Sequence, residues 1–303
     1  MTYNQLWKRL TAIYNEREAQ AIVRTVLDAL FGMSLTDICL GKVTQLSADD
    51  TTRLEKIMQR LEKSEPVQYV LGAEWFAGRL FDVAPGVLIP RPETEDLVKW
   101  ACDEAKEKED NSKEERGKEE KEVSKKGEEA PHPSILDIGT GSGCIAITVA
   151  LALPQARVTA WDISTDALAI AAGNAHRLGA SVRFEHQDAL SAPDDEERWD
   201  VIVSNPPYIC DRERADMSDN VISYEPELAL FVPDNDPLLF YHAIARYASK
   251  ALKPGGRLLF ETNTAYAHEV AQVMADEGFT AIEVRNDCFG KPRMVKGAFI
   301  REE

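Results

Sequence analysis

Apolar residues recur at every third or fourth position over much of the first 64 residues, which is the spacing of amphipathic helices. Two such stripes cover residues 6–14 and 22–31, and Gly32 follows the second stripe, where a glycine commonly ends a helix. Ser34 and Ser47 precede further apolar stretches and are predicted N-caps, because a serine hydroxyl can accept from the first free N–H groups of a helix. The pattern predicts a small helical bundle with no chemistry of its own.

Beyond residue 72 the helical spacing gives way to short apolar runs. Residues 74–83 are predicted to form a β-hairpin, and from residue 134 short apolar runs alternate with helical stretches, as in βαβ units. The predicted strands cover 134–138, 158–162, 182–188, 201–203 and 257–261, with a final pair that begins at 280–283. The predicted helices cover 144–151, 236–252 and 267–277, and 253–256 is a predicted turn. Nearly continuous apolar strands are buried on both faces, so the predicted fold class is α/β with a doubly wound parallel sheet.

These elements divide the chain, which is long enough for two domains. We predict a helical domain over 1–72, a hairpin linker over 73–92 and an α/β domain over 93–303. The α/β domain contains a charged low-complexity insert, 103–131, which follows a helix predicted over 94–102. A solvated helix and a disordered loop would both fit the insert, and Gly117 and Gly127 favour the loop.

The overall charge argues against one class of partner. The net charge is −17, and the stretch 103–130, with twelve acidic and eight basic residues, accounts for only a small part of it. A protein that grips duplex nucleic acid by itself usually carries a basic excess, so no such binding is expected. No apolar run approaches the length of a membrane span, and the start at Met1 is unlike a signal peptide, so we expect a cytoplasmic protein. The five cysteines are scattered without a C-x-x-C spacing, so neither disulfides nor a metal site is expected.

The first candidate site is a glycine-rich loop between the strand 134–138 and the helix 144–151. The loop consists of Gly139, Thr140, Gly141, Ser142 and Gly143. Glycines allow left-handed backbone and close approach of a ligand, while the helix start presents free N–H groups. The spacing is G-x-G-x-G, so it differs from the dinucleotide fingerprint G-x-G-x-x-G. Asp137, just before the loop, would repel a pyrophosphate and attract an ammonium or sulfonium group.

Acidic residues also stand at the ends of the next two predicted strands. Asp162 ends the strand 158–162, where a carboxylate can accept hydrogen bonds from both hydroxyls of a ribose. Asp188, followed by Ala189, comes at the end of the third strand and is placed to meet an adenine amino group. Because the carboxyl ends of parallel strands share one edge of the sheet, these groups are predicted to surround one ligand.

The motif Asn205-Pro206-Pro207-Tyr208 follows the apolar run 201–203. The two prolines cannot donate to a sheet ladder, so the chain must leave the sheet there in a rigid loop. Asn205 and the carbonyl of Pro206 can accept the N–H bonds of a planar –NH2 group, and the ring of Tyr208 can pack on its plane. Four residues alone also fit a plain strand-ending turn with an incidental asparagine. The motif does not distinguish a glutamine amide from an adenine or guanine amine.

Together these residues resemble the class I S-adenosylmethionine-dependent methyltransferases, which have a Rossmann-like sheet. Within that group the chain resembles the HemK/PrmC family of protein-(glutamine-N5) methyltransferases. The resemblance includes residues 66–72, 76–78 and 87–95 and a D-x-x-G-x-x-R-x-V ending over 287–295, so it runs from about Pro66 to the C-terminus apart from the insert. It implies S-adenosylmethionine as cofactor and, as substrate, the glutamine of the Gly-Gly-Gln motif of peptide chain release factors. It also implies that the N-terminal helices dock this protein substrate.

In this family the expected catalytic residues are Asn205, Pro206, Pro207 and Tyr208. The expected cofactor-binding residues are Asp137, Gly139, Thr140, Gly141, Ser142, Gly143, Asp162, Asp188, Ala189 and Asn205.

Three other functions remain open at this point. One is a glutamine methyltransferase that acts on a ribosomal protein, and another is a methyltransferase of nucleic-acid exocyclic amines, which the acidic charge disfavours. The third is a non-catalytic binding platform, which the intact set of glycines and acids disfavours.

Overall fold

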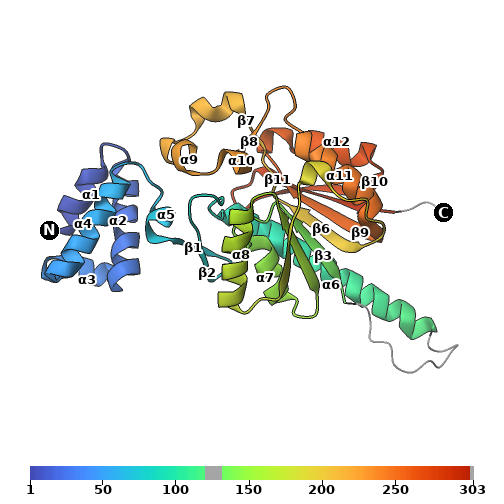
Figure 1. The fold of residues 1–303 in the computed structure, drawn as a ribbon, viewed down its shortest axis with the longest axis horizontal. Coiled ribbons are helices and arrows are strands. Elements are labelled where there is room, and N and C mark those ends of the chain that lie inside the picture. The colour runs from blue at the N-terminus through green and yellow to red at the C-terminus, as the bar shows by residue number, and fades with distance from the viewer. Residues whose placement is uncertain (120–131, 301–303) are drawn as a thin grey trace. The chain divides into compact units, whose positions relative to one another are not determined.

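The computed structural model describes residues 1–119 and 132–300, with backbone alone for 109–119, and the chain divides into two compact units (Figure 1). The first unit comprises Met1–Ala73, Val83–Pro85 and Asp216–Glu225. The second comprises Glu74–Asp82, Gly86–Ala215 and Pro226–Glu303. The segment 216–225 includes the short helix α9 (Asp219–Tyr224), whose Tyr224 hydroxyl donates to the carbonyl of Lys63 at 2.7 Å. Domains defined as continuous stretches of sequence cannot include this segment, which lies far along the chain from the rest of its unit.

The first unit is the predicted helical bundle. Its helices are α1 (Tyr3–Leu10), α2 (Glu16–Phe31), α3 (Leu35–Cys39), the 3-10 turn η1 (Lys42–Gln45), α4 (Ala48–Leu61) and α5 (Val67–Leu71). Gly32 ends α2 with a φ of 61°, and the hydroxyls of Ser34 and Ser47 accept from the N–H groups of Asp37 and Asp50. The predicted caps are therefore confirmed. Apolar side chains of these helices form one core that includes the fully buried Leu6, Leu10, Leu27, Leu54 and Met58.

The second unit is built on a seven-stranded sheet in the order β10-β11-β9-β6-β3-β4-β5. Its strands are β3 (Ser134–Ile138), β4 (Arg157–Asp162), β5 (Val182–His186), β6 (Trp199–Ser204), β9 (Leu252–Glu261), β10 (Phe279–Asn286) and β11 (Pro292–Phe299). Strands β3, β4, β5, β6 and β9 run parallel, and β10 and β11 add an antiparallel hairpin at one edge. Along the chain, β4 and β5 are added on one side of β3, and β6 and β9 follow on the other side. The winding direction therefore reverses between β3 and β6.

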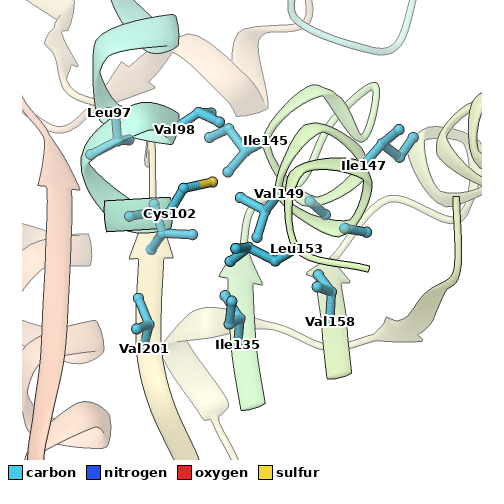
Figure 2. Close-up of a cluster of buried hydrophobic side chains, with 14 of the residues drawn as sticks. Leu97, Val98, Cys102, Ile135, Ile145, Ile147, Val149, Leu153, Val158 and Val201 are labelled. Carbon is cyan, nitrogen blue, oxygen red and sulfur yellow. The ribbon is translucent and has the colours of Figure 1, made fainter. Parts of the chain in front are cut away.

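Helices cover both faces of this sheet (Figure 1). They are α6 (Pro92–Glu119), α7 (Cys144–Ala152), α8 (Thr165–Leu178), α11 (Leu239–Ala251) and α12 (Ala267–Asp276). Figure 2 shows the core on one face, where α6 and α7 pack on β3, β4 and β6 through side chains such as Val98, Val149 and Ile135. On the opposite face α11 and α12 pack on the same sheet. The predicted doubly wound α/β fold is confirmed.

Smaller elements surround the sheet. The predicted hairpin is formed by β1 (Ala73–Phe76) and β2 (Arg79–Asp82), and Phe76 and Phe81 are buried in the core with their rings 6.0 Å apart. A short parallel pair, β7 (Ile209–Cys210) with β8 (Phe231–Val232), follows the loop after β6. The remaining turns and helices are η2 (Ala189–Ser191), η3 (Asp211–Asp216), α10 (Glu227–Leu230) and η4 (Thr264–Tyr266).

Two local predictions were wrong. We predicted that the charged insert forms a loop, which is wrong for residues 103–119, because α6 continues without a break to Glu119. Residues 120–131 lie outside the described part. Lys108 contributes to this extension, since its ammonium group donates to the carbonyl of Pro254 at 3.1 Å. The segment 253–256 is a bulge within β9 rather than a turn before it. The pairing with β6 jumps from Leu252 to Arg257, and Gly255 adopts a φ of 70° that permits the detour.

Candidate active site

A cavity of about 290 Å³ lies at the carboxyl ends of β3, β4, β5 and β6, where the winding of the sheet reverses. This is the place where open α/β sheets bind ligands. The glycine loop, the ends of β4 and β5 and the loop after β6 all contribute to its wall. Eight of the predicted site residues line it: Gly139, Gly141, Asp162, Asp188, Ala189, Asn205, Pro206 and Pro207.

The glycine loop is held by backbone hydrogen bonds to the neighbouring strand. The N–H groups of Gly139 and Thr140 both donate to the carbonyl of Trp161 at 2.9 Å, which fixes the loop against β4. Gly139 and Gly141 have φ angles of 77° and 55° and present their backbone to the cavity. Left-handed backbone favours glycine at both positions. These two glycines can therefore let a ligand approach the main chain.

The rest of the loop faces the protein interior. Thr140 and Ser142 are buried, and the carbonyl of Ser142 accepts from Asn174 Nδ2 at 2.9 Å. Gly143 caps α7 with a φ of 82°, and a Cβ atom there would lie 2.7 Å from Ile147 Cδ1. None of these three residues lines the cavity. Their side of the loop packs against α7 and α8.

Asp137 is also behind the loop, fully buried. Its Oδ2 accepts from the Thr140 hydroxyl at 2.6 Å and from the N–H of Ala146 at 3.1 Å, while Oδ1 has no hydrogen-bond partner among the described residues. Burial raises the pKa of this carboxyl to about 7. The carboxyl group thus ties β3, the loop and the start of α7 together rather than lying on the cavity wall.

Asp162 reaches the cavity and also braces it. Its Oδ2 accepts from the N–H of Gly141 and its Oδ1 from the N–H of Ser164, each at 2.8 Å. Burial raises the pKa of this carboxyl, and the backbone donors oppose that shift. Each carboxylate oxygen has two lone pairs, so both can still accept from a ligand hydroxyl. Asp162 lies on the cavity wall, and its contact with a ribose stays a prediction.

The far wall of the cavity combines one acid with apolar groups. Asp188 caps the turn η2, with Oδ1 accepting from the N–H of Leu190 at 2.8 Å. Ile163, Ala189 and Leu190 line the cavity beside it. Ile163 and Leu190 were not among the predicted site residues. Ile163 directly follows Asp162, and Leu190 lies close to Asp188 in the sequence. S-adenosylmethionine has hydroxyl and amino groups that can donate to carboxylates and a flat base that can lie on an apolar wall. The residues of this cavity fit those parts.

The loop after β6 places its first three residues on the wall and its fourth elsewhere. Asn205, Pro206 and Pro207 line the cavity. The Tyr208 hydroxyl donates to Glu261 Oε1 at 3.3 Å, and the ring packs against the core beneath α11. Burial raises the pKa of this phenol, so it stays protonated at neutral pH.

A buried polar cluster behind this loop was not predicted. The Thr94 hydroxyl donates to Glu261 Oε2 at 2.7 Å and lies 3.5 Å from Asn205 Nδ2. Thr94 does not line the cavity. The signal in the sequence was Glu261 itself, an acid that ends the apolar run 257–260.

Within the described residues, no helix is both long and apolar enough to cross a membrane.

Two protein families match parts of this chain. Residues 3–72 match the family described as PrmC N-terminal domain, and residues 125–226 match the methyltransferase small domain. Among solved structures, TrmN from Thermus thermophilus shares 25% identity with a TM-score of 0.41, over 56% of this chain and 45% of that one.

Two relatives are similar over almost their full lengths. The release factor glutamine methyltransferase of Bacteroides thetaiotaomicron is 44% identical over 287 residues, which cover 94% of this chain and 95% of the relative. The protein of the same name from Flavobacterium psychrophilum is 37% identical over 295 residues, with 97% of each chain covered. The chain belongs to the release factor glutamine methyltransferase family.

Proposed function

We propose that this protein transfers a methyl group from S-adenosylmethionine to the side-chain amide nitrogen, N5, of the glutamine in the Gly-Gly-Gln motif of peptide chain release factors. The observation that carries the proposal is the shared wall of one cavity: Asn205 and Pro206 line it together with Gly141 and Asp162. A group that can orient an amide therefore lies beside groups that can hold the cofactor. The family membership points to the release factor as the protein substrate.

The cofactor would be held by residues from three strand ends. Asp162 would accept from the ribose hydroxyls, Asp188 would accept from the adenine amino group, and Ile163 and Leu190 would cover the base. Gly139 and Gly141 would let the remainder approach the backbone. When bound, S-adenosylmethionine supplies an electrophilic methyl group next to a positively charged sulfur. Asp137, Thr140, Ser142 and Gly143 would act indirectly by fixing the loop.

The chain's own contribution to the reaction is to position the acceptor. Asn205 Oδ1 and the carbonyl of Pro206 would accept the two N–H bonds of the glutamine amide and so direct the nitrogen lone pair. The nitrogen would take the methyl carbon as the methyl–sulfur bond breaks and its electron pair stays on sulfur, which leaves the cofactor as a neutral thioether. The extra proton on the nitrogen would then leave to solvent, so no side chain would need to act as a base beforehand. Rate enhancement would come from orientation and electrostatics. Pro207 would keep the loop rigid, and Tyr208 would support it from behind.

The N-terminal unit would have a different task. We propose that the helices within 1–72 dock the release factor, since this region matches the PrmC N-terminal domain.

Asn205→Ala tests the role of the loop. Turnover should fall by about 10²–10³-fold, by analogy with loss of one oxyanion-hole donor. The affinity for S-adenosylmethionine, measured by calorimetry, should change far less, because the side chain is proposed to contact the acceptor. Normal turnover in this variant would refute the proposed orientation of the amide. Equal losses of turnover and cofactor affinity would assign Asn205 to the cofactor instead.

A further inference from the structure

A buried carboxyl group lies behind the loop that carries Asn205, and the reaction described above gives it no role. Glu261 ends β9 and is only 1% exposed. Both of its carboxylate oxygens accept hydrogen bonds: Oε2 from the Thr94 hydroxyl at 2.7 Å and Oε1 from the Tyr208 hydroxyl at 3.3 Å. The ionised form of the carboxyl accepts on both oxygens, whereas a protonated form would have to donate from one of them.

The direction of these hydrogen bonds reaches Asn205. A hydroxyl group carries a single proton, and the proton of Thr94 is donated to Glu261. The Thr94 oxygen can therefore only accept from the Asn205 side chain, whose Nδ2 lies 3.5 Å away. The contact is long, as hydrogen bonds often are in catalytic sites before substrate binds. With its NH2 group turned to Thr94, the amide has its carbonyl oxygen, Oδ1, free of hydrogen bonds from any described residue.

We infer that Glu261 is a positioning residue for methyl transfer, which acts through the Thr94 hydroxyl to hold the Asn205 amide with its oxygen available to the acceptor. The inference rests on the proposed function, because it needs Asn205 to accept from the substrate's N–H. In the opposite orientation, the NH2 group of Asn205 would meet the NH2 group of the acceptor, and two donors cannot bond to one another. An ionised carboxylate at position 261 can only accept, so Thr94 donates to it and cannot donate to Asn205. This prevents the opposite orientation.

The ionised state of Glu261 is poised to change near neutral pH. Burial raises the pKa of this carboxyl to about 7, while the hydrogen bond from Thr94 and the charge of Arg293 oppose the shift. The charged and titratable groups that face it are Glu93 of α6, Cys144 of α7, Tyr208 of the loop after β6, Tyr241 of α11 and Arg293 of β11. Burial raises the pKa of the Cys144 thiol to about 12 and also raises the pKa values of both phenols, so these three stay neutral.

The hydrogen bonds that link Glu261 through Thr94 to Asn205 form a relay. Protonation of Glu261 would reverse the direction of these hydrogen bonds. A protonated carboxyl can donate to Thr94, which then can donate to Asn205 Oδ1 and occupy the oxygen that the acceptor needs. Turnover at saturating S-adenosylmethionine should therefore decrease as the pH falls below about 7.

The variants Thr94→Val, Thr94→Ser and Glu261→Gln test the relay with release factor as substrate and S-adenosylmethionine at saturation. Thr94→Val removes the bridging oxygen and keeps the shape, and Glu261→Gln adds a donor. Both should lower kcat by about tenfold, roughly the effect of one oriented hydrogen bond. Thr94→Ser keeps the hydroxyl and should restore kcat. The affinity for S-adenosylmethionine should stay near wild type in all three.

Two further measurements separate positioning from general support of the fold. In the Asn205→Ala background, Thr94→Val should cause no additional loss, because its effect acts through the amide that is absent. The decrease in kcat below pH 7 should vanish in Glu261→Gln and persist in Glu93→Gln, which alters the other facing carboxyl group. Should Glu261→Gln not fold, the Thr94→Val and Thr94→Ser pair and the double variant still decide the question.

The inference is overturned if Thr94→Val keeps wild-type kcat, or if its loss simply multiplies that of Asn205→Ala. It is also overturned if Thr94→Ser does not restore turnover. These results would leave the proposed function intact as long as Asn205→Ala alone is impaired. A fully active Asn205→Ala variant would instead refute the role of Asn205 on which the relay depends.

Discussion

Replacing Gly143 by alanine should destabilise the second unit more than the same change at Gly141. Both glycines are in left-handed backbone, with φ angles of 82° and 55°, so an alanine at either position carries a strain of about 1–2 kcal/mol. Their surroundings differ. A Cβ atom on Gly141 would have no neighbour within 4 Å, whereas one on Gly143 would lie 2.7 Å from Ile147 Cδ1 and 3.3 Å from the Cα atom of Ala171.

The crowding at Gly143 is not easily relieved. Ile147 and Ala171 are both fully buried, and the Cα atom of Ala171 belongs to α8 and cannot move without the helix. Overpacking of this kind adds about 1–3 kcal/mol. Since about 1 kcal/mol corresponds to roughly 2–4 °C for a unit of this size, Gly143→Ala should melt at least a few degrees below Gly141→Ala.

Thermal unfolding followed by circular dichroism, with urea unfolding as a second measure, compares the two variants directly. Gly141→Ala is the matched control, because it shares the backbone strain and lacks the contact. Equal melting temperatures would refute the packing argument. They would mean that α7 and α8 separate readily at this point.

Two other outcomes follow from the carboxyl groups of the site. Asp162→Ala should weaken binding of S-adenosylmethionine by about tenfold to a hundredfold, the value of a charged hydrogen bond, and unchanged affinity by calorimetry would remove Asp162 from the cofactor site. Asp137, with its pKa raised to about 7, binds its proton more tightly in the folded state, so its contribution to the free energy of unfolding declines as the pH rises from about 4 to 7. Asp137→Asn should therefore reduce the fall in melting temperature between pH 5 and pH 8, and an identical slope in both proteins would contradict the raised pKa.

Much of the sheet could be predicted because its strands are apolar on both faces. The runs 134–138 and 201–203 can only be buried centrally, and β3 and β6 are indeed neighbours in the middle of the sheet. The caps at Ser34 and Ser47 were predictable because they are local hydrogen bonds. The insert was harder. Gly117 favoured a loop, yet α6 runs on past its apolar turns, where intrinsic helix propensity of glutamate and lysine outweighs one glycine.

The sequence predicted where the site lies better than it predicted the role of each residue in it. Acids and glycines at strand ends must gather at one edge, so Asp162, Asp188 and Asn205 could be grouped without coordinates. Which way each side chain points depends on tertiary contacts. Asp137 turns inward to Thr140 and Ala146, and Tyr208 turns to Glu261, a residue 53 positions away. The partnership of Thr94 with Glu261 joins residues 167 positions apart and leaves no local pattern.

The most direct test of the account is to find which atom receives the methyl group. The purified protein, S-adenosylmethionine with a labelled methyl group and a release factor would be incubated together, with ribosomes in a parallel reaction and the Asn205→Ala variant as the control. Mass spectrometry of the digested products should place one added methyl group on the glutamine of the Gly-Gly-Gln motif, at its side-chain amide, and far less in the control. An unmodified release factor beside a methylated ribosomal protein or nucleic acid would contradict the proposed substrate.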